Sequence, residues 1–323
     1  MGLLNRSSRG STAGLVGLVG LVALNVVLVG WALRSNDTTP ESSLSAPLGS
    51  TAASAGPSST PSVTPSTTAI ATATGTATTT TAAAPLQTIL VALDNQRAWR
   101  IRVGSCADGG AKVATTTDGG TTWADTKAPL GTIVRVRPTD GQSAFVIGAD
   151  TSCAAEFKST TDGGATWGSD SAVGGAWFRN PKNPKVVRAP GASTSQPCAE
   201  LAVLDLAVVS QSTARVLCAD GLVRSTTNTG SSWTDSGEVT GAVALAATSA
   251  GPAKAYVARL DVPDCAGIQV QRVDQSVATS CIQTAVPHDP GQIALSLVKG
   301  GGWLAVGDIT MRSTDGLVTW TAS

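Results

Sequence analysis

Four copies of one short motif constrain the fold of this chain more than any other feature of its 323 residues. In each copy two Ser or Thr residues precede an Asp or Asn, Gly follows, and a Ser/Thr–Trp pair ends the motif. The copies occupy residues 116–123, 160–167, 226–233 and 313–320. Motifs that recur every few tens of residues are typical of repeat architectures, in which each repeat is one supersecondary unit. The chain is therefore expected to fold as a set of similar units.

The residue types of the motif predict a tight turn between two strands. An Asp or Asn side chain accepts hydrogen bonds from nearby backbone N–H groups, and Gly adopts a positive φ without a clash. Thr and Trp favour the flanking strands, and Trp packs a large apolar surface on neighbouring chain. These structural roles are assigned to Asp118, Gly120, Trp123, Asp162, Gly164, Trp167, Asn228, Gly230, Trp233, Asp315 and Trp320. Because Asn228 and Leu317 depart from the pattern, the turns of the third and fourth copies are expected to be slightly distorted.

The spacing of the copies bears on the number of repeats. Asp118 and Asp162 are 44 residues apart, Asp162 and Asn228 are 66 apart, and Asn228 and Asp315 are 87 apart. A four-stranded propeller blade takes about 40–50 residues. The first interval therefore fits one blade, and the other two intervals are longer than one blade.

We interpret the second interval as one blade with an inserted loop at 169–199, and the third as two blades, one of which has lost its motif near Asp274. The prediction is an all-β fold, a five-bladed β-propeller of four-stranded blades, over residues 87–323. It is expected to follow one transmembrane helix and a disordered stalk.

Short alternating segments are consistent with strands in front of each motif copy and of Asp274. The expected strand pairs are 88–93 and 98–103, 132–137 and 143–147, 201–209 and 213–218, 242–247 and 255–260, and 293–298 and 303–306. Each motif would then join the third and fourth strands of a blade. The first strand follows residue 86 and the last ends at Ser323, so the ring is expected to close by contact of whole blades without a shared strand.

The first 86 residues carry different patterns. Residues 12–33 have no charged side chain and are long enough to cross a bilayer, which takes about 20 apolar residues. Arg6 and Arg9 precede them, which predicts an anchor with residues 1–11 in the cytoplasm; a cleaved signal peptide is the alternative. Residues 34–86 are almost wholly Ser, Thr, Ala, Pro and Gly, which predicts a disordered stalk. The propeller is thus expected on the outer side of a cell membrane, and the heavy use of Ala, Thr, Gly and Val is typical of a high-GC bacterium.

All six cysteines lie in the predicted propeller. An even number of cysteines outside the cytoplasm predicts disulfides. The expected pairs are Cys265–Cys281, at the two ends of a hairpin, Cys198–Cys218, on either side of two adjoining strands, and, by elimination, Cys106–Cys153. A metal site is not expected, because the sequence has one His and no closely spaced Cys pair.

The motif resembles the Asp-box, or bacterial neuraminidase repeat, whose pattern is Ser/Thr-x-Asp-x-Gly-x-Thr-Trp, and the copies at 116–123 and 160–167 match it closely. Asp-box propellers include sialidases and other glycoside hydrolases, sortilin-type receptors and the photosystem II assembly/stability factor family. The short blades and the phrase at 216–224 look most similar to bacterial relatives of that assembly factor. The resemblance implies a scaffold that binds protein partners.

In a meandering propeller the motif hairpins emerge on one face, so a partner is expected to meet the opposite face. The inserted loop and nearby connections carry aromatic and charged residues of the kind enriched at interface hot spots. The candidate partner-binding residues are Trp177, Phe178, Arg179, Lys182, Glu238, Asp264 and His288. The alternative for the inserted loop is an irregular segment packed on the rim.

An enzyme is the alternative to a binding module. A sialidase resemblance would imply three arginines around a substrate carboxylate and a Tyr nucleophile, but the only tyrosine, Tyr256, lies in an expected strand. Arg100 with Arg102, and Arg135 with Arg137, share strand faces, and solvated or ion-paired side chains are favoured there over a substrate clamp. Facing carboxylates in the central channel would indicate a glycosidase, whereas a channel of small and apolar residues would indicate binding.

Charge excludes one class of function. The chain has 22 basic and 22 acidic residues, whereas a nucleic-acid-binding protein normally shows a basic excess. The sequence therefore predicts a membrane-tethered, extracytoplasmic module that binds a protein or a cell-surface glycan, without a cofactor or nucleic acid. No catalytic residue is assigned. A cell-surface glycoside hydrolase is the alternative.

Overall fold

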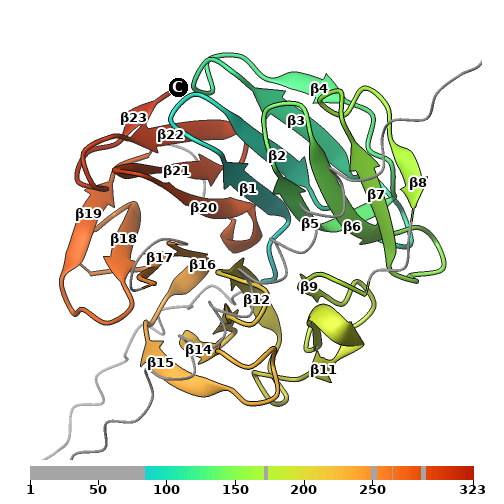
Figure 1. Cartoon of the computed structure of the whole chain (residues 1–323). Coiled ribbons are helices and arrows are strands. Elements are labelled where there is room, and N and C mark those ends of the chain that lie inside the picture. Colours follow the sequence, from blue (N-terminus) through green and yellow to red (C-terminus); the bar gives the residue numbers. More distant parts are fainter. Residues whose placement is uncertain (1–83, 171–173, 249–252, 264, 285–288) are drawn as a thin grey trace, which may run out of the picture. The chain divides into compact units, whose positions relative to one another are not determined.

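The computed structural model describes residues 84–170, 174–248, 253–263, 265–284 and 289–323. These residues form a β-propeller of six antiparallel sheets, or blades, around a central channel (Figure 1). Each blade is a meander in which strands adjacent in sequence pair with each other. The expected arrangement, with each motif between the third and fourth strands of a blade, is confirmed.

The first three blades are formed by residues 88–195. Blade 1 comprises β1 (Thr88–Ala92), β2 (Ala98–Arg102), β3 (Lys112–Thr116) and β4 (Ala124–Thr126). Blade 2 comprises β5 (Thr132–Pro138), β6 (Ala144–Ala149), β7 (Glu156–Thr160) and β8 (Gly168–Asp170). Blade 3 comprises only β9 (Phe178–Arg179), β10 (Val187–Arg188) and β11 (Thr194–Ser195), with the 3-10 turn η1 (Pro190–Ala192) between the last two.

The last three blades each have four strands. Blade 4 comprises β12 (Val203–Val208), β13 (Ala214–Cys218), β14 (Leu222–Thr226) and β15 (Thr234–Glu238). Blade 5 comprises β16 (Ala242–Ala247), β17 (Ala255–Arg259), β18 (Ile268–Arg272) and β19 (Ala278–Ile282). Blade 6 follows η2 (Pro290–Gln292) and comprises β20 (Ile293–Val298), β21 (Gly301–Val306), β22 (Ile309–Ser313) and β23 (Thr321–Ala322).

The prediction of five blades was wrong, because residues 169–199 do not form an irregular loop. They contribute the end of β8 and the three short strands of blade 3. Strands of two residues carry too little alternation to be seen as strands in a sequence, and the segment has no turn motif. The interpretation of the third interval as two blades was right, since blade 5 has no motif copy and turns near Asp274.

The apolar core is divided into clusters at the boundaries between blades. Separate clusters join blades 1 and 2, 3 and 4, 4 and 5, 5 and 6, and 6 and 1. No cluster of this kind joins blades 2 and 3 in the part of the chain that the structure describes. At that boundary Ile147 of blade 2 and Phe178 of blade 3 are buried individually, so apolar packing is present there but is less extensive than at the other boundaries.

The motif turns are held by their Asp or Asn side chains. Asp118 Oδ1 accepts hydrogen bonds from Thr116 Oγ1 (2.8 Å) and Thr122 N–H (3.0 Å), and Asp118 Oδ2 accepts one from Thr122 Oγ1 (2.6 Å). Those bonds, above all from Thr122 Oγ1, lower the pKa of Asp118 to about 2. Equivalent bonds lower the pKa values of Asp162 and Asp315 to about 2. Their oxygens are engaged in the turn.

The two irregular copies keep these bonds. Asn228 Oδ1 accepts from Ser232 N–H (3.0 Å), and its Nδ2 donates to Ser232 Oγ (2.8 Å). Leu317 N–H donates to Ser313 Oγ (3.0 Å), as Gly120 N–H does to Thr116 Oγ1 (3.0 Å). The turns are therefore not opened; instead Thr229 and Leu317 adopt left-handed φ values of 59° and 75°, which are unfavourable for these side chains.

Each motif Trp packs on the preceding blade. Trp167 and Trp99 form an edge-to-face pair with ring centroids 6.5 Å apart, and Trp123 and Trp303 form another at 6.5 Å. Trp320 Nε1 donates to Ser280 Oγ of blade 5 (3.1 Å). Edge-to-face contact adds favourable electrostatics to apolar burial. The motifs therefore join the blades to one another.

The ring closes between blades 6 and 1 without a shared strand, as expected. Arg100 Nη1 donates to Asp308 O (2.8 Å), and Arg102 forms an ion pair with the Asp308 carboxylate. Arg312 Nη1 donates to Asn95 O (2.6 Å). Because these side chains clasp the first blade to the last, Arg100 and Arg102 have a structural role.

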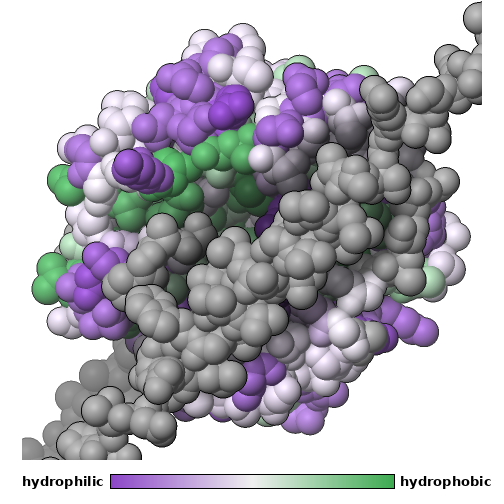
Figure 2. Space-filling model, in the orientation of Figure 1, coloured by the Kyte–Doolittle hydropathy of each residue, from purple (hydrophilic) through white to green (hydrophobic). Residues whose placement is uncertain are grey.

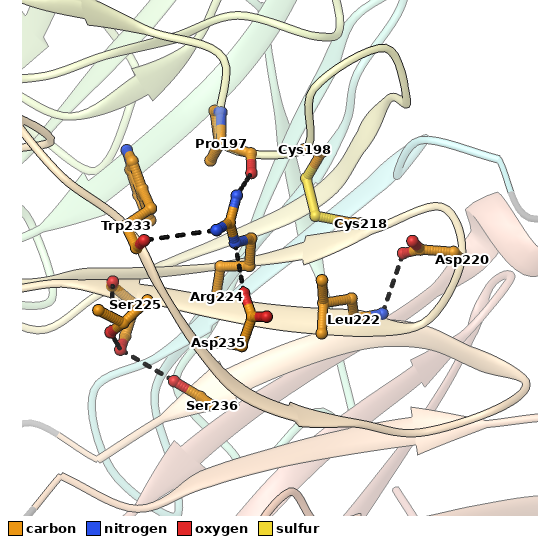
Figure 3. A network of polar contacts seen from close by, with 11 residues as sticks. Pro197, Cys198, Cys218, Asp220, Leu222, Arg224, Ser225, Trp233, Asp235 and Ser236 are labelled. Carbon is orange, nitrogen blue, oxygen red and sulfur yellow. Dashed lines mark hydrogen bonds and ion pairs between the residues drawn. A yellow bond between two sulfur atoms is a disulfide. The ribbon is translucent and has the colours of Figure 1, made fainter.

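Blade 3 is tied to blade 4 at the rim. The disulfide Cys198–Cys218 joins the segment after β11 to β13, with Cα atoms 5.5 Å apart. Figure 3 shows Arg224 beside it: its guanidinium donates to Pro197 O (2.6 Å) and Asp235 Oδ1 (2.7 Å). The other disulfides join Cys106 to Cys153 and Cys265 to Cys281, so all three have the expected pairing.

The predicted anchor over residues 12–33 and nearly all of the predicted stalk over 34–86 lie outside the described residues. Among the residues that are described, none belongs to a helix that is long and apolar enough to span a bilayer. Leu86, at the predicted end of the stalk, is buried, and its N–H lies 3.3 Å from Leu204 O. The membrane helix that formed part of the predicted fold is therefore unsupported by the structure.

Candidate functional site

The central channel contains a cavity of about 410 Å³. Its walls come from the inner strands β1, β5, β12, β16 and β20, with Leu86 and Arg179. Most of the lining residues are aliphatic, and the charged ones are Arg135, Arg137, Arg179 and Asp205. Figure 2 shows one face of the propeller, with hydrophobic surface over β20 and β21 and hydrophilic residues on the rim.

Among the described residues, blade 3 has no inner strand like that of the other five blades. Trp177, just before β9, is equivalent to Trp99 and Trp303 in the second strands of blades 1 and 6. Trp303 Nε1 donates to Asp94 O in the next blade (2.9 Å), and Trp177 Nε1 donates to Gln211 O in its next blade (2.9 Å). β9 is therefore a second strand, and in the described chain no strand precedes it in its sheet. Figure 1 shows β9 between β5 and β12 around the ring.

On one side of this vacant position, β5 presents two arginines. Val136 is buried against blade 1, and alternate side chains of a strand point to opposite faces, so Arg135 and Arg137 face blade 3. Arg135 Nε is buried without a hydrogen-bond partner, and no hydrogen bond or ion pair joins this side chain to another described residue. Burial, and to a smaller degree the charge of Arg137, lowers the pKa of Arg135 to about 10.

On the other side, β12 presents apolar side chains. Leu206 and Val208 pack against the cluster that joins blades 3 and 4. Arg179 extends from β9 toward this strand, is only 6% exposed, and donates from Nη1 to Leu204 O (2.9 Å). Burial lowers the pKa of Arg179, and the nearby Asp205 opposes that shift.

Asp205 is the only carboxylate among the described residues that line the cavity. Its Oδ1 accepts from Leu206 N–H (2.7 Å), and its Oδ2 accepts from Leu245 N–H (2.7 Å), which links blades 4 and 5. Burial raises its pKa to about 6, although both backbone bonds and Arg179 act in the opposite direction. At neutral pH the cavity therefore holds three guanidinium groups and one carboxylate. Arg179 donates a hydrogen bond to Leu204 O, whereas no hydrogen bond or ion pair joins Arg135 or Arg137 to another described residue.

This arrangement suits an anion better than it suits hydrolysis. A guanidinium group binds a carboxylate or phosphate through two parallel hydrogen bonds. Glycoside hydrolysis requires two carboxyl groups across the scissile bond, whereas the described lining has only Asp205, whose oxygens bind backbone amides. Within the described ranges, no group of three or more His, Cys, Asp or Glu side chains could hold a metal ion.

The candidate partner-binding residues are not gathered on one surface. Trp177 and Phe178 are buried at 2% and 4% exposure, and Arg179 lies in the channel. Lys182, beyond β9, and Glu238, at the end of β15, are exposed. Asp264 and His288 lie outside the described residues. The sequence shows Arg135 and Arg137 as a pair on one strand face, for which solvated or ion-paired side chains are expected. No sequence pattern points to Asp205.

No protein-family model and no curated protein sequence matches the chain. Among solved structures, it is similar to a GH74 enzyme of Niastella koreensis (14% identity, 72% of this chain, 46% of that chain, TM-score 0.39). It is also similar to YCF48 bound to D1 peptide (16% identity, 75% and 81%, TM-score 0.28). A third is the Aleuria aurantia lectin in complex with Fucalpha1-6GlcNAc (10% identity, 75% and 96%, TM-score 0.47). The chain spans less than half of the GH74 enzyme, and similarities of this degree leave function to be argued from the channel.

Proposed function

We propose that this protein is an extracytoplasmic binding module whose central channel recognises an anionic group of a protein or glycan ligand. The observation that carries the proposal is the half-buried Arg135 side chain, which lines the cavity and whose buried Nε has no hydrogen-bond partner. A charge that is largely removed from water and has no partner destabilises a fold, so its presence in the channel is accounted for by a ligand that supplies the opposite charge.

Three features of the channel favour binding over catalysis. The cavity is of the size of small-molecule sites, which are about 300–1,000 Å³. Most of its lining residues are aliphatic, with a few charged groups among them, as is common in recognition sites. The pair of facing carboxylates that a glycoside hydrolase requires is missing from the described lining. The Asp-box resemblance fits the same role, because it implies a scaffold.

The extracytoplasmic location is supported by the three disulfides, which use all six cysteines. Disulfides persist in oxidising compartments and are rare in the cytoplasm. The membrane anchor over residues 12–33 stays a prediction from the sequence.

The test is a screen of the full chain against glycan and peptide arrays that contain neutral and acidic members. We expect acidic members to be retained, and Arg135→Gln to weaken their binding about tenfold, the loss of one charge-assisted pair. Lys112→Gln is the matched control, because Lys112 is an exposed cation at the start of β3, outside the channel. Retention of neutral members only, or equal binding by the wild type and Arg135→Gln, would contradict the proposal.

A further inference from the structure

We infer that the vacant inner-strand position of blade 3 binds an extended peptide of a partner protein, in which acidic side chains alternate with apolar ones. The inference rests on the proposed function and specifies its ligand. It depends on three properties of the vacant position: a free strand edge, two walls of different chemistry, and a spacing that matches an extended chain.

The free edge belongs to β9. Asn180 N–H donates to Val186 O in the hairpin with β10 (2.9 Å). Backbone groups of successive residues in a strand point to opposite sides, so the N–H and C=O of Arg179 point away from β10, toward the channel. In the other five blades an inner strand pairs with the corresponding edge. A ligand strand can bond to Arg179 in the same way, which is the mode of recognition called β-strand addition.

The two walls differ in chemistry. β5 presents Arg135 and Arg137 on one side, and β12 presents Leu206 and Val208 on the other. A peptide strand between them would point its side chains alternately to the two walls. Acidic residues at positions i and i+2 would reach the arginines, while apolar residues at i+1 and i+3 would cover Leu206 and Val208.

The spacing also fits. Two residues of an extended strand span about 6.6 Å, which applies equally to Arg135 and Arg137 on β5 and to residues i and i+2 of the ligand. The arginines can therefore bind two acidic side chains without a break in either strand. The six residues of β12, at about 3.3 Å each, give the position a length of about 20 Å, enough for a ligand segment of five or six residues.

No segment of this chain has the charge pattern that would match Arg135 and Arg137 in the inner-strand position of blade 3. None of its 22 acidic residues lies two positions from another. Residues 1–83, which precede the propeller, contain only Asp37 and Glu41, four positions apart. Neither the N-terminal part of the same molecule nor a second copy can thus place two carboxylates on Arg135 and Arg137 from one strand. The two arginines therefore favour a segment of a different protein as the ligand.

The test is a fluorescence-anisotropy titration of the full chain with three labelled hexapeptides. The first is Ser-Glu-Leu-Glu-Val-Ser, the second is its isomer Ser-Glu-Glu-Leu-Val-Ser, and the third is Ser-Gln-Leu-Gln-Val-Ser. We expect the first to bind at least about tenfold more tightly than its isomer, because only alternation places both acids on one wall. Arg135→Gln and Arg137→Gln should each weaken binding of the first peptide by about tenfold, and Lys112→Gln should leave it unchanged.

A second measurement reads the backbone of β9. On addition of the first peptide, the amide of Arg179 should exchange its hydrogen at least about tenfold more slowly. Arg137 is exposed, so Arg137→Gln keeps the test valid if a change at Arg135 impairs folding.

Equal affinity for the two acidic isomers would overturn this inference, as would binding that is insensitive to both arginine variants. If acidic glycans bind through Arg135 while the alternating peptide does not, the inference fails and the proposed function stands. If no anionic ligand depends on Arg135, both fail.

Discussion

The unpartnered guanidinium of Arg135 leads to an unusual prediction: Arg135→Met should stabilise the free protein. Burial lowers the pKa of Arg135 from its ordinary value to about 10, and each pKa unit corresponds to about 1.4 kcal/mol. The buried charge thus costs the native state at most about 3 kcal/mol. Met retains most of the aliphatic stem, so we expect the free energy of unfolding to rise by about 1–3 kcal/mol.

The measurement is urea-induced unfolding of the wild type and the variant at pH 7, followed by tryptophan fluorescence. Arg102→Met is the control. Arg102 belongs to the other Arg-x-Arg pair, on the second strand of blade 1, and forms an ion pair with Asp308, so its loss should be neutral or destabilise by about 0–1 kcal/mol. A variant Arg135→Met that is less stable than the wild type would show that the guanidinium has a native partner, and would refute the reasoning.

The pH dependence of this difference has a defined sign. The pKa of Arg135 is lower in the native state than in the unfolded state, so the penalty is fully present below pH 10. As the pH rises above 10, the native state loses its proton first, and the advantage of Arg135→Met over the wild type should shrink. Ligand should narrow the difference in stability by a separate route. At a peptide concentration of 100 Kd the wild type gains about 2.7 kcal/mol, whereas a variant that binds about tenfold more weakly gains about 1.4 kcal/mol.

Three further predictions concern other parts of the propeller. Because the pKa of Asp205 is raised to about 6, the native state takes up a proton at a higher pH than the unfolded state does. The stability of the wild type relative to Asp205→Asn should therefore increase from pH 7 to pH 4, by at most about 3 kcal/mol. Urea titrations that show a decrease instead would contradict the raised pKa. Thr229 has a left-handed φ of 59°, so Thr229→Gly should stabilise the native state by about 0.5–1 kcal/mol. Leu317→Gly should instead destabilise the native state by about 1–3 kcal/mol, because a buried side chain is lost. Thermal unfolding of the two variants tests this difference. Removal of the disulfide Cys198–Cys218, which closes a loop of 20 residues, should cost about 3 kcal/mol of stability. It should also increase hydrogen exchange in blade 3, whereas removal of Cys265–Cys281 should not. Equal exchange of blade 3 in both variants would show that Cys198–Cys218 does not hold blade 3 to blade 4.

Most of the ring could be predicted because its units repeat. The expected strands of the four-stranded blades lie within a few residues of those observed, since alternation and turn residues act locally. The pairing of Cys198 with Cys218 followed from the same strand assignments. Closure without a shared strand followed from the positions of the first and last strands.

The number of blades could not be predicted, because the strands of blade 3 have two residues each. A two-residue strand is stabilised by its neighbours in space and leaves almost no periodicity. One signal was available: the pair Ala176–Trp177 repeats Ala98–Trp99, which begins the second strand of blade 1. Read as a strand start, it would have identified a sixth blade.

The candidate site was hidden for a related reason. Arg135 and Arg137 have the same spacing as Arg100 and Arg102. Arg100 and Arg102 bind Asp308 at the closure of the ring, whereas Arg135 and Arg137 face a position that no described strand occupies. The difference is that blade 6 provides Asp308 as a partner for Arg100 and Arg102. Such a contact with another blade cannot be predicted from the local sequence around the arginines. The sequence predicts Trp177 and Arg179 as partner-binding residues, whereas both are buried through contacts with β12 and its following loop.

A blade without an inner strand would be expected to collapse inward or to detach, and the rim of blade 3 explains why neither happens. Trp177 is fixed by Gln211 O and by an edge-to-face contact with Trp233, with ring centroids 6.1 Å apart. The disulfide Cys198–Cys218 and the Arg224 bonds hold the other end of the blade to blade 4. Because these attachments lie on the side of blade 4, the boundary with blade 2 stays without an apolar cluster. The polar and covalent attachments of blade 3 are therefore concentrated on the side of blade 4, which leaves Arg135 on blade 2 free to meet a ligand.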